Sequence, residues 1–182
     1  MATEFLEEIR KLNVTDPAEM VDLAIKWVQK SFPNVESVPT ETLQSWLEEK
    51  PEDLLILDIR KEDEFEVSHL PGAIRVDPGS NIQEILQEHL QKEPEQQKRV
   101  VCYCTVGYRA SMTAQSLNEF LSSKQGQKLK PFMKIYNAKG GLAKWARERK
   151  PMVDKQEHST HLIHPYNAEW AKLVEPELQA QI

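Results

Sequence analysis

The sequence predicts an α/β fold in which an open, mainly parallel β-sheet carries helices on both faces. Strand-like apolar runs alternate with helical patterns along the chain, which is typical of parallel strands connected by helices. Residues 54–59 form an apolar run without polar alternation, as expected for a strand buried on both faces. The 182 residues, 40% of them hydrophobic, suffice for one core of ordinary size. Ligands of such sheets bind beyond the carboxyl ends of the strands, so functional residues are expected there.

Residues 1–37 are predicted to form a helical extension to this domain. Residues 4–12 show weak helical spacing, and a clearer helix starts at Pro17 with Asp16 as its N-cap. The Ser-Phe-Pro-Asn segment at 31–34 ends this helix. The apolar residues of the second helix fall on one face, which we expect to pack against the domain: Met20, Leu23, Ala24, Trp27 and Val28.

Residues 38–150 are predicted to form the α/β domain itself. Thr40 is expected to cap its first helix, and Pro151 to stop its last one. The helix that starts at Arg109 is expected to end near Gly126. The other predicted elements are, in chain order, a strand at 54–59, a short helix at 61–67, a short strand at 73–76, a helix at 81–92, a surface loop at 93–98, a strand at 99–104, a strand at 132–136 and a helix at 142–149.

The most informative segment is residues 100–111, where an apolar strand runs into Cys104 and a helix follows after a short loop. A helix N-terminus carries roughly half a positive charge and several unpaired N–H donors, so the loop favours an anion such as a thiolate. Gly107 allows the loop to turn with its amides facing inward. Cys104 is therefore the candidate nucleophile.

The helix dipole alone does not stabilise a thiolate sufficiently, because it supplies only ~0.3–1 kcal/mol. The rest of the stabilisation of the thiolate is expected from the loop N–H groups and from the guanidinium of Arg109. A cysteine is more commonly a small buried hydrophobe, and Cys102 is interpreted in that way. For Cys104, the combination of strand, cysteine, glycine and arginine favours the nucleophile.

Three segments of this domain, in the right order, resemble the signatures of the rhodanese family of sulfurtransferases. The central one is the six-residue pattern Cys-x-x-Gly-x-Arg at 104–109. The first signature is matched by 54–60, Glu64-Phe65 and 69–73, and the last by Tyr136-Asn137 and 140–145.

The resemblance implies that Cys104 carries a persulfide, formed from a sulfane-sulfur donor and passed to a thiophilic acceptor. It implies Arg109 and the loop amides as the anion cradle, and Asp58 and Arg60 as supports near the pocket. Within the resemblance His69 fixes a turn, although an acid–base role is the alternative. The implied cycle needs no metal and no organic cofactor. The substrate-binding loop would comprise Thr105, Val106, Gly107 and Tyr108, with Tyr108 either a pocket wall or a hydroxyl donor.

The resemblance implies thiosulfate or a low-molecular persulfide as the donor, and a small thiol or a protein thiol as the acceptor. The loop interior contains no lysine and no second arginine, which disfavours a small dianion. We therefore expect a larger persulfide, such as one derived from glutathione.

Two other functions remain open. Cysteine phosphatases and arsenate reductases resemble this site but place five residues between cysteine and arginine, whereas four intervene here. The shorter loop argues against phosphate chemistry. Rhodanese-like domains can also be non-catalytic binding or regulatory modules. In a variant of this interpretation, Cys104 is a sulfur-relay or redox-sensing residue whose acceptor is a protein. The presence of both Cys104 and Arg109 counts against a purely non-catalytic module.

The net charge of −6 is unevenly distributed. Residues 124–150 hold nine Lys or Arg and one Glu, so they carry +8 and the remainder carries −14. A solvated face explains this stretch, and the alternative is a positive rim around Lys139 and Lys144 that attracts an anionic donor or an acidic partner. The acidic balance and the absence of an aromatic platform argue against nucleic-acid binding.

The chain contains no apolar run of the length that a membrane span requires. Its acidic N-terminus resembles neither a secretory signal nor a transit peptide. Two cysteines two residues apart on one strand cannot form an ordinary disulfide, which indicates a reducing compartment and hence the cytosol.

Residues 151–182 are predicted to form a C-terminal extension that packs on the domain. His158, His161 and His164 repeat every third residue, which is compatible with a metal site. However, Pro165 interrupts the segment and no further ligand lies nearby, so a solvent-facing stretch is expected here. The later residues are too apolar for a free tail and are expected to fold back near the pocket mouth: Pro165, Tyr166, Trp170, Leu173 and Val174.

Overall fold

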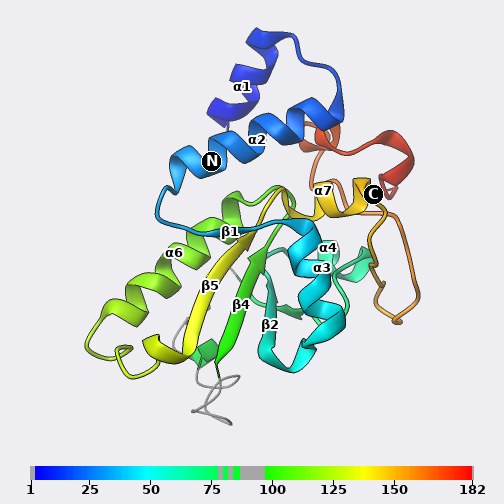
Figure 1. Cartoon of the computed structure of the whole chain (residues 1–182). Helices are drawn as coiled ribbons and strands as arrows, with labels where there is room; N and C mark the ends of the chain where they lie inside the picture. Colours follow the sequence, from blue (N-terminus) through cyan, green and yellow to red (C-terminus); the bar gives the residue numbers. More distant parts are fainter. Residues whose placement is uncertain (1–2, 78–79, 82–83, 87–96, 182) are drawn as a thin grey trace.

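The computed structural model describes residues 3–77, 80–81, 84–86 and 97–181. A five-stranded sheet with the order β1-β5-β4-β2-β3 forms its centre, and every pair of neighbouring strands is parallel (Figure 1). This confirms the predicted α/β fold with a parallel sheet. The strands are β1 (Ser37–Val38), β2 (Leu54–Asp58), β3 (Ile74–Arg75), β4 (Lys98–Tyr103) and β5 (Met133–Ala138).

The two central strands, β2 and β4, are largely buried, which explains why their sequences are apolar without polar alternation. Residues 100–103 of β4 are completely buried, because helices cover the sheet on both faces. β2 and β4 run in register from Leu54 opposite Arg99 to Asp58 opposite Tyr103. Since parallel strands end at the same edge, the residues that follow β2 and β4 come together there.

Helices on the two faces of the sheet enclose two separate parts of the core. On one face, Leu43 and Trp145 pack in a cluster with residues of the C-terminal extension. On the other face, Ala114 and Leu117 pack against the sheet. The helices of the domain are α3 (Thr40–Glu49), α4 (Glu62–Val67), α6 (Tyr108–Ser122) and α7 (Gly141–Arg147).

Two N-terminal helices, α1 (Thr3–Leu12) and α2 (Pro17–Ser31), lie over the carboxyl edge of the sheet (Figure 1). Of the apolar stripe predicted for α2, all residues except Val28 pack in a third cluster, together with Phe5 of α1, Val106 of the cysteine loop and Leu173 of the C-terminal extension. The two ends of the chain are thereby joined to each other above the cysteine loop.

Several predicted details differ from the structure. Asp16 occupies the N-cap position of α2, but its side chain makes no capping hydrogen bond. Thr40 does not cap α3: Pro39 is the N-cap residue, and the Thr40 hydroxyl is buried without a hydrogen-bond partner. The helix from the cysteine loop ends at Ser122, before Gly126.

The last helix of the domain is shorter than predicted, and only part of the segment before β4 can be compared with the prediction. α7 ends at Arg147 rather than at residue 149, because Arg149 adopts a left-handed backbone conformation with φ of 58°. Of the helix predicted at 81–92, residues 84–86 are helical, and most of the remainder lies outside the described residues. Most of the loop predicted at 93–98 lies outside them as well.

The C-terminal extension packs on the domain through short bridges and apolar contacts. Val153 pairs with His69, and Ile163 pairs with Gln179. Ile163, Val174 and Leu178 are buried in the cluster that contains α3 and α7.

The prediction of a solvent-facing histidine stretch is wrong for one of the three histidines. His158 and His161 are exposed, but His164 is only 8% exposed. Its Nδ1 accepts a hydrogen bond from the Tyr166 N–H at 3.0 Å, and its Nε2 lies 3.5 Å from a carboxylate oxygen of Asp63. Within the described part of the chain, no three His, Cys, Asp or Glu side chains form a cluster that could hold a metal.

Candidate active site

Cys104 follows the last residue of β4, at the edge of the sheet that the N-terminal helices cover. Its Sγ accepts hydrogen bonds from the Gly107 N–H at 3.1 Å and from the Ala110 N–H at 3.4 Å. These donors come from the loop and from the first turn of α6. Hydrogen bonds of this kind favour an anionic sulfur over a neutral one.

Gly107 makes this inward turn possible. Its φ of 115° lies in the left-handed region, and a Cβ there would lie 3.1 Å from Nδ2 of the buried Asn137. A side chain at this position would therefore be strained and crowded at once.

The start of α7 holds the other side of the loop. The Leu142 N–H donates to the Cys104 carbonyl at 2.9 Å, and the Ala143 N–H donates to the Thr105 carbonyl at 3.0 Å. Gly141 allows this approach, because its φ is 59° and a Cβ on it would lie 2.4 Å from the Thr105 carbonyl oxygen.

Arg109 forms a two-pronged ion pair with Glu64 of α4. Its Nη1 and Nη2 each lie 3.0 Å from a different oxygen of the Glu64 carboxylate. Nη2 also donates to the Thr105 hydroxyl at 3.0 Å, and the guanidinium lies 4.9 Å from the centre of the Tyr166 ring. Arg109 thus joins the cysteine loop to α4 and to the C-terminal extension.

The pKa values of this pair favour the charged forms. Burial acts to raise the pKa of Glu64, but hydrogen bonds and the charge of Arg109 outweigh it, so the pKa lies below its ordinary value. Burial acts to lower the pKa of Arg109, and Glu64 together with the Cys104 sulfur raises it above its ordinary value. The sequence did not indicate this pairing, although Glu64 lies in one of the quoted signatures.

Asp58 and Arg60 form a buried support below the loop and do not line the cavity described below. Arg60 donates to both carboxylate oxygens of Asp58, at 3.0 Å and 2.8 Å, and to the Ser68 carbonyl at 2.6 Å. The Tyr103 hydroxyl also donates to Asp58. Burial, followed by the charge of Asp58, raises the pKa of Tyr103 well above its ordinary value, so the phenol stays protonated.

His69 contacts the chain rather than the cavity. Its ring stacks on Phe65 with centres 3.7 Å apart, and its Nδ1 lies 2.8 Å from the Phe65 carbonyl oxygen. Its backbone exchanges hydrogen bonds with Val153. These contacts support the turn-fixing role.

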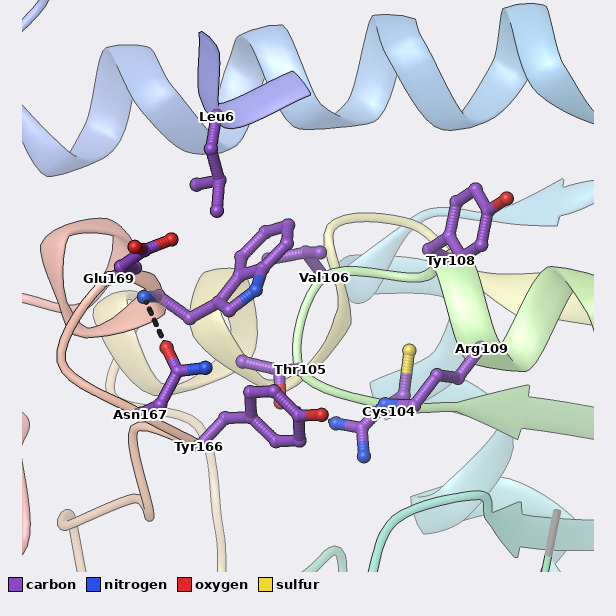
Figure 2. A pocket seen from close by; sticks show the side chains of 10 residues that line it. Leu6, Cys104, Thr105, Val106, Tyr108, Arg109, Tyr166, Asn167 and Glu169 are labelled. Carbon is purple, nitrogen blue, oxygen red and sulfur yellow. Dashed lines mark hydrogen bonds between the residues drawn. The ribbon is translucent and has the colours of Figure 1, made fainter. Parts of the chain in front are cut away.

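A cavity of about 220 Å³ opens in front of Cys104 (Figure 2). Leu6 reaches it from α1, and Tyr166 lies beside the Arg109 guanidinium (Figure 2). Thr105, Val106 and Tyr108 of the predicted loop line the cavity, and Gly107 does not. The described lining residues are Leu6, Cys104, Thr105, Val106, Tyr108, Arg109, Tyr166, Asn167, Glu169 and Trp170.

Stacked aromatic rings connect the loop to both chain ends. The Tyr108 ring stacks on Trp27 of α2 at 4.7 Å, Trp27 stacks on Phe5 at 4.8 Å, and Phe5 stacks on Trp170 at 5.9 Å. Tyr108 is therefore a wall residue whose ring is anchored by α2. The sequence indicated Tyr166 and Trp170 near the pocket by their apolar character, but carried no signal for Leu6, Asn167 or Glu169.

The basic stretch at 124–150 contributes none of the residues that line this cavity. Lys134 pairs with Glu36, and Arg149 lies close to Glu175 and Glu177. These partners offset part of its charge at the surface. Lys139 and Lys144, the residues of the alternative positive rim, are not among the described residues that line the cavity.

Both cysteines are free and buried, but only Cys104 borders the cavity and accepts backbone hydrogen bonds on its sulfur. Cys102 is completely buried in the core below the sheet edge, and burial, with a smaller effect of Cys104, raises its pKa to about 12. We expect iodoacetamide to modify Cys104 and to leave Cys102 unmodified in the folded protein at pH 8. Peptide mass spectrometry measures this, with the urea-unfolded protein, in which both should react, as the control. Modification of Cys102 in the folded protein would contradict the assignment.

A parallel α/β sheet with a cysteine loop cradled by backbone amides at its carboxyl edge defines the class of this protein. The chain belongs to the rhodanese-like domain family, whose sequence profile matches residues 40–148. Thiosulfate sulfurtransferase GlpE of Coxiella burnetii is 30% identical over 103 residues, covering 57% of this chain and 81% of that protein. The putative sulfur carrier protein YrkF of Bacillus subtilis is 27% identical over 119 residues, covering 64% of this chain and 56% of that protein.

Solved structures show the same fold. A thiosulfate sulfurtransferase from Pseudomonas aeruginosa matches with a TM-score of 0.56 and 20% identity, covering 80% of this chain and 24% of that chain. A protein from Rhodopseudomonas palustris, described as a possible tyrosine phosphatase, matches with a TM-score of 0.51 and 19% identity, covering 72% of this chain and 92% of that chain. The fold therefore serves more than one proposed chemistry, and the site must discriminate between them. Among the described residues, no helix is long and apolar enough to cross a bilayer.

Proposed function

We propose that this chain is a sulfurtransferase that carries a sulfane sulfur as a persulfide on Cys104. The observation that carries the proposal is the position of its Sγ, which accepts two backbone N–H bonds and borders a cavity. The thiolate attacks the outer sulfur of the donor, a new S–S bond forms, and the donor's bond to that sulfur breaks. The rest of the donor leaves as an anion with the electron pair. No metal or organic cofactor takes part.

In the second half of the cycle an acceptor thiolate attacks the outer sulfur of the persulfide. The S–S bond to Cys104 breaks, and Cys104 leaves as a thiolate that the same two amides stabilise. The acceptor is a small thiol or a protein thiol. Because both steps need a free thiol, the cytosol remains the proposed compartment.

We assign Arg109 two tasks in this cycle. Its positive charge stabilises the sulfur anion, and its bonds to Glu64 and Thr105 keep the loop in place. Asp58, Arg60 and His69 act through the backbone that they support. The four-residue spacing between Cys104 and Arg109 favours sulfur transfer over phosphate hydrolysis.

Intact mass spectrometry tests the proposal directly. The protein is incubated with thiosulfate and, separately, with glutathione persulfide, of which we expect the larger donor to load better. We expect the wild type to gain the mass of one sulfur atom. Cys104→Ser should gain none, and Cys102→Ser, as the matched control, should load like the wild type.

The absence of loading with either donor would contradict the proposal and favour a binding module. Hydrolysis of p-nitrophenyl phosphate that depends on Cys104, without sulfur loading, would favour a phosphatase instead.

A further inference from the structure

Half of the residues that line the cavity lie outside the family domain. The cysteine loop supplies the floor, and Leu6 together with Tyr166, Asn167, Glu169 and Trp170 comes from the two extensions. The shape of the cavity therefore depends on parts of the chain that lie beyond the matched residues 40–148.

The wall formed by the C-terminal extension is held in a fixed position relative to Cys104. The backbone N–H of Trp170 donates to Oδ1 of Asn167 at 2.9 Å, and the Trp170 ring stacks on Phe5. Tyr166 lies against the Arg109 guanidinium, with the Lys61 ammonium group 5.3 Å from the centre of its ring. A wall of this kind offers ring surface to the part of a donor that does not react.

The charges at the cavity are already balanced. Arg109 and Glu169 are the two charged side chains among the described lining residues. The charge of Arg109 is shared between the Glu64 carboxylate at 3.0 Å and the Cys104 sulfur, and Glu169 lies 3.5 Å from Arg10. Thiosulfate would bring two negative charges next to a thiolate, and none of the described lining residues offers a cation that lacks a carboxylate partner. A donor with one charge reduces this repulsion, and an organic body can be buried against the wall.

We propose that Tyr166 and Trp170 are specificity-determining residues that select sulfur donors with an organic body, aromatic bodies most strongly, over thiosulfate. The inference rests on the proposed sulfurtransferase function, and it adds the substrate class and the residues that recognise it. It places the choice of donor in the C-terminal extension rather than in the cysteine loop.

Two thiosulfonates that share a reacting group provide the test. Benzenethiosulfonate and methanethiosulfonate both carry one charge. In each case the Cys104 thiolate attacks the outer sulfur, the S–S bond to the sulfonyl group breaks, and a sulfinate leaves with the electron pair. We expect kcat/KM to be higher for benzenethiosulfonate than for methanethiosulfonate, and lowest for thiosulfate.

Removing the Trp170 ring should lower kcat/KM for benzenethiosulfonate by about tenfold and change that for methanethiosulfonate by less than about threefold. Trp170→Leu is preferred to alanine because it retains an apolar side chain in the packed extension. Trp46→Leu is the matched control: Trp46 is also partly buried but contacts Tyr136 and Arg99, away from the cavity. Trp46→Leu should leave kcat/KM unchanged for both thiosulfonates.

Three results would overturn the inference. In Trp170→Leu, kcat/KM could fall equally for both thiosulfonates, or it could fall for neither. The wild type could also prefer thiosulfate. A binding experiment separates this failure from failure of the proposed function. Cys104→Ser is titrated with benzenesulfinate and methanesulfinate and followed by ligand-observed NMR, which needs no sulfur transfer. Tighter binding of benzenesulfinate that disappears in Cys104→Ser/Trp170→Leu supports the wall even if no donor loads Cys104, and equal binding of the two sulfinates contradicts it.

Discussion

Gly141→Ala is expected to reduce persulfide loading of Cys104 by about 100-fold, because it displaces the cysteine loop. A Cβ at this position would lie 2.4 Å from the Thr105 carbonyl oxygen and 2.7 Å from the Cys104 carbonyl oxygen. Both are backbone atoms, so no side chain can rotate away to relieve the clash. The two hydrogen bonds from the start of α7 to the loop must then lengthen or break. Single-turnover loading, measured by intact mass, reports the effect.

Gly72→Ala is the matched control for backbone strain. Gly72 is also left-handed, with φ of 78°, but nothing lies within 4 Å of a Cβ built on it. It should lose about 1–2 kcal/mol of stability and keep the wild-type rate of loading. Circular dichroism establishes that each variant is folded. A folded Gly141→Ala protein that loads within a few-fold of the wild type would show that α7 does not position the loop.

Glu64→Ala is expected to lower the free energy of unfolding by about 3–5 kcal/mol at pH 7, because it leaves the Arg109 cation buried without its partner. The side chain of Glu64 is 1% exposed and that of Arg109 is 15% exposed, so water cannot replace the lost carboxylate well. Urea unfolding measures this loss. Glu66→Ala is the control, since Glu66 pairs with Lys155 on the surface and should lose less than about 1 kcal/mol.

The same pair makes stability depend on pH in a defined direction. The pKa of Glu64 is lowered in the folded protein, so its contribution is complete above the pKa of the unfolded chain, about 4.3, and is lost as the pH falls through the folded value. The difference in stability between the wild type and Glu64→Gln should therefore shrink below about pH 4.3. A difference that stays constant from pH 7 to pH 3 would refute the ionised pair.

The apolar runs at residues 54–59 and 99–104 were sufficient to predict the central strands and hence the parallel sheet. A strand buried on both faces must be apolar at consecutive positions, and this local pattern survives without tertiary information. The candidate nucleophile could be predicted equally well from the sequence, because the cysteine, the glycine and the arginine of the loop lie within six residues. Caps and helix ends were harder to predict: Pro39 rather than Thr40 is the N-cap residue of α3, and a shift of one or two residues at a helix end leaves the apolar pattern of the helix unchanged.

The partners of these residues could not be predicted. Glu64 and Arg109 are 45 positions apart, and neither spacing nor composition links them. His164 follows the same three-residue repeat as His158, yet only His164 is buried, because the chain turns back onto α4 at that point.

The sequence by itself determined the parallel α/β architecture and the cysteine at its carboxyl edge, since both follow from short segments. The tertiary structure alone decided that Glu64 pairs with Arg109 and that Leu6, Asn167 and Glu169 complete the cavity wall. The physical reason is that charge balance and cavity shape arise where segments distant in the chain pack together, and packing is a property of the whole fold.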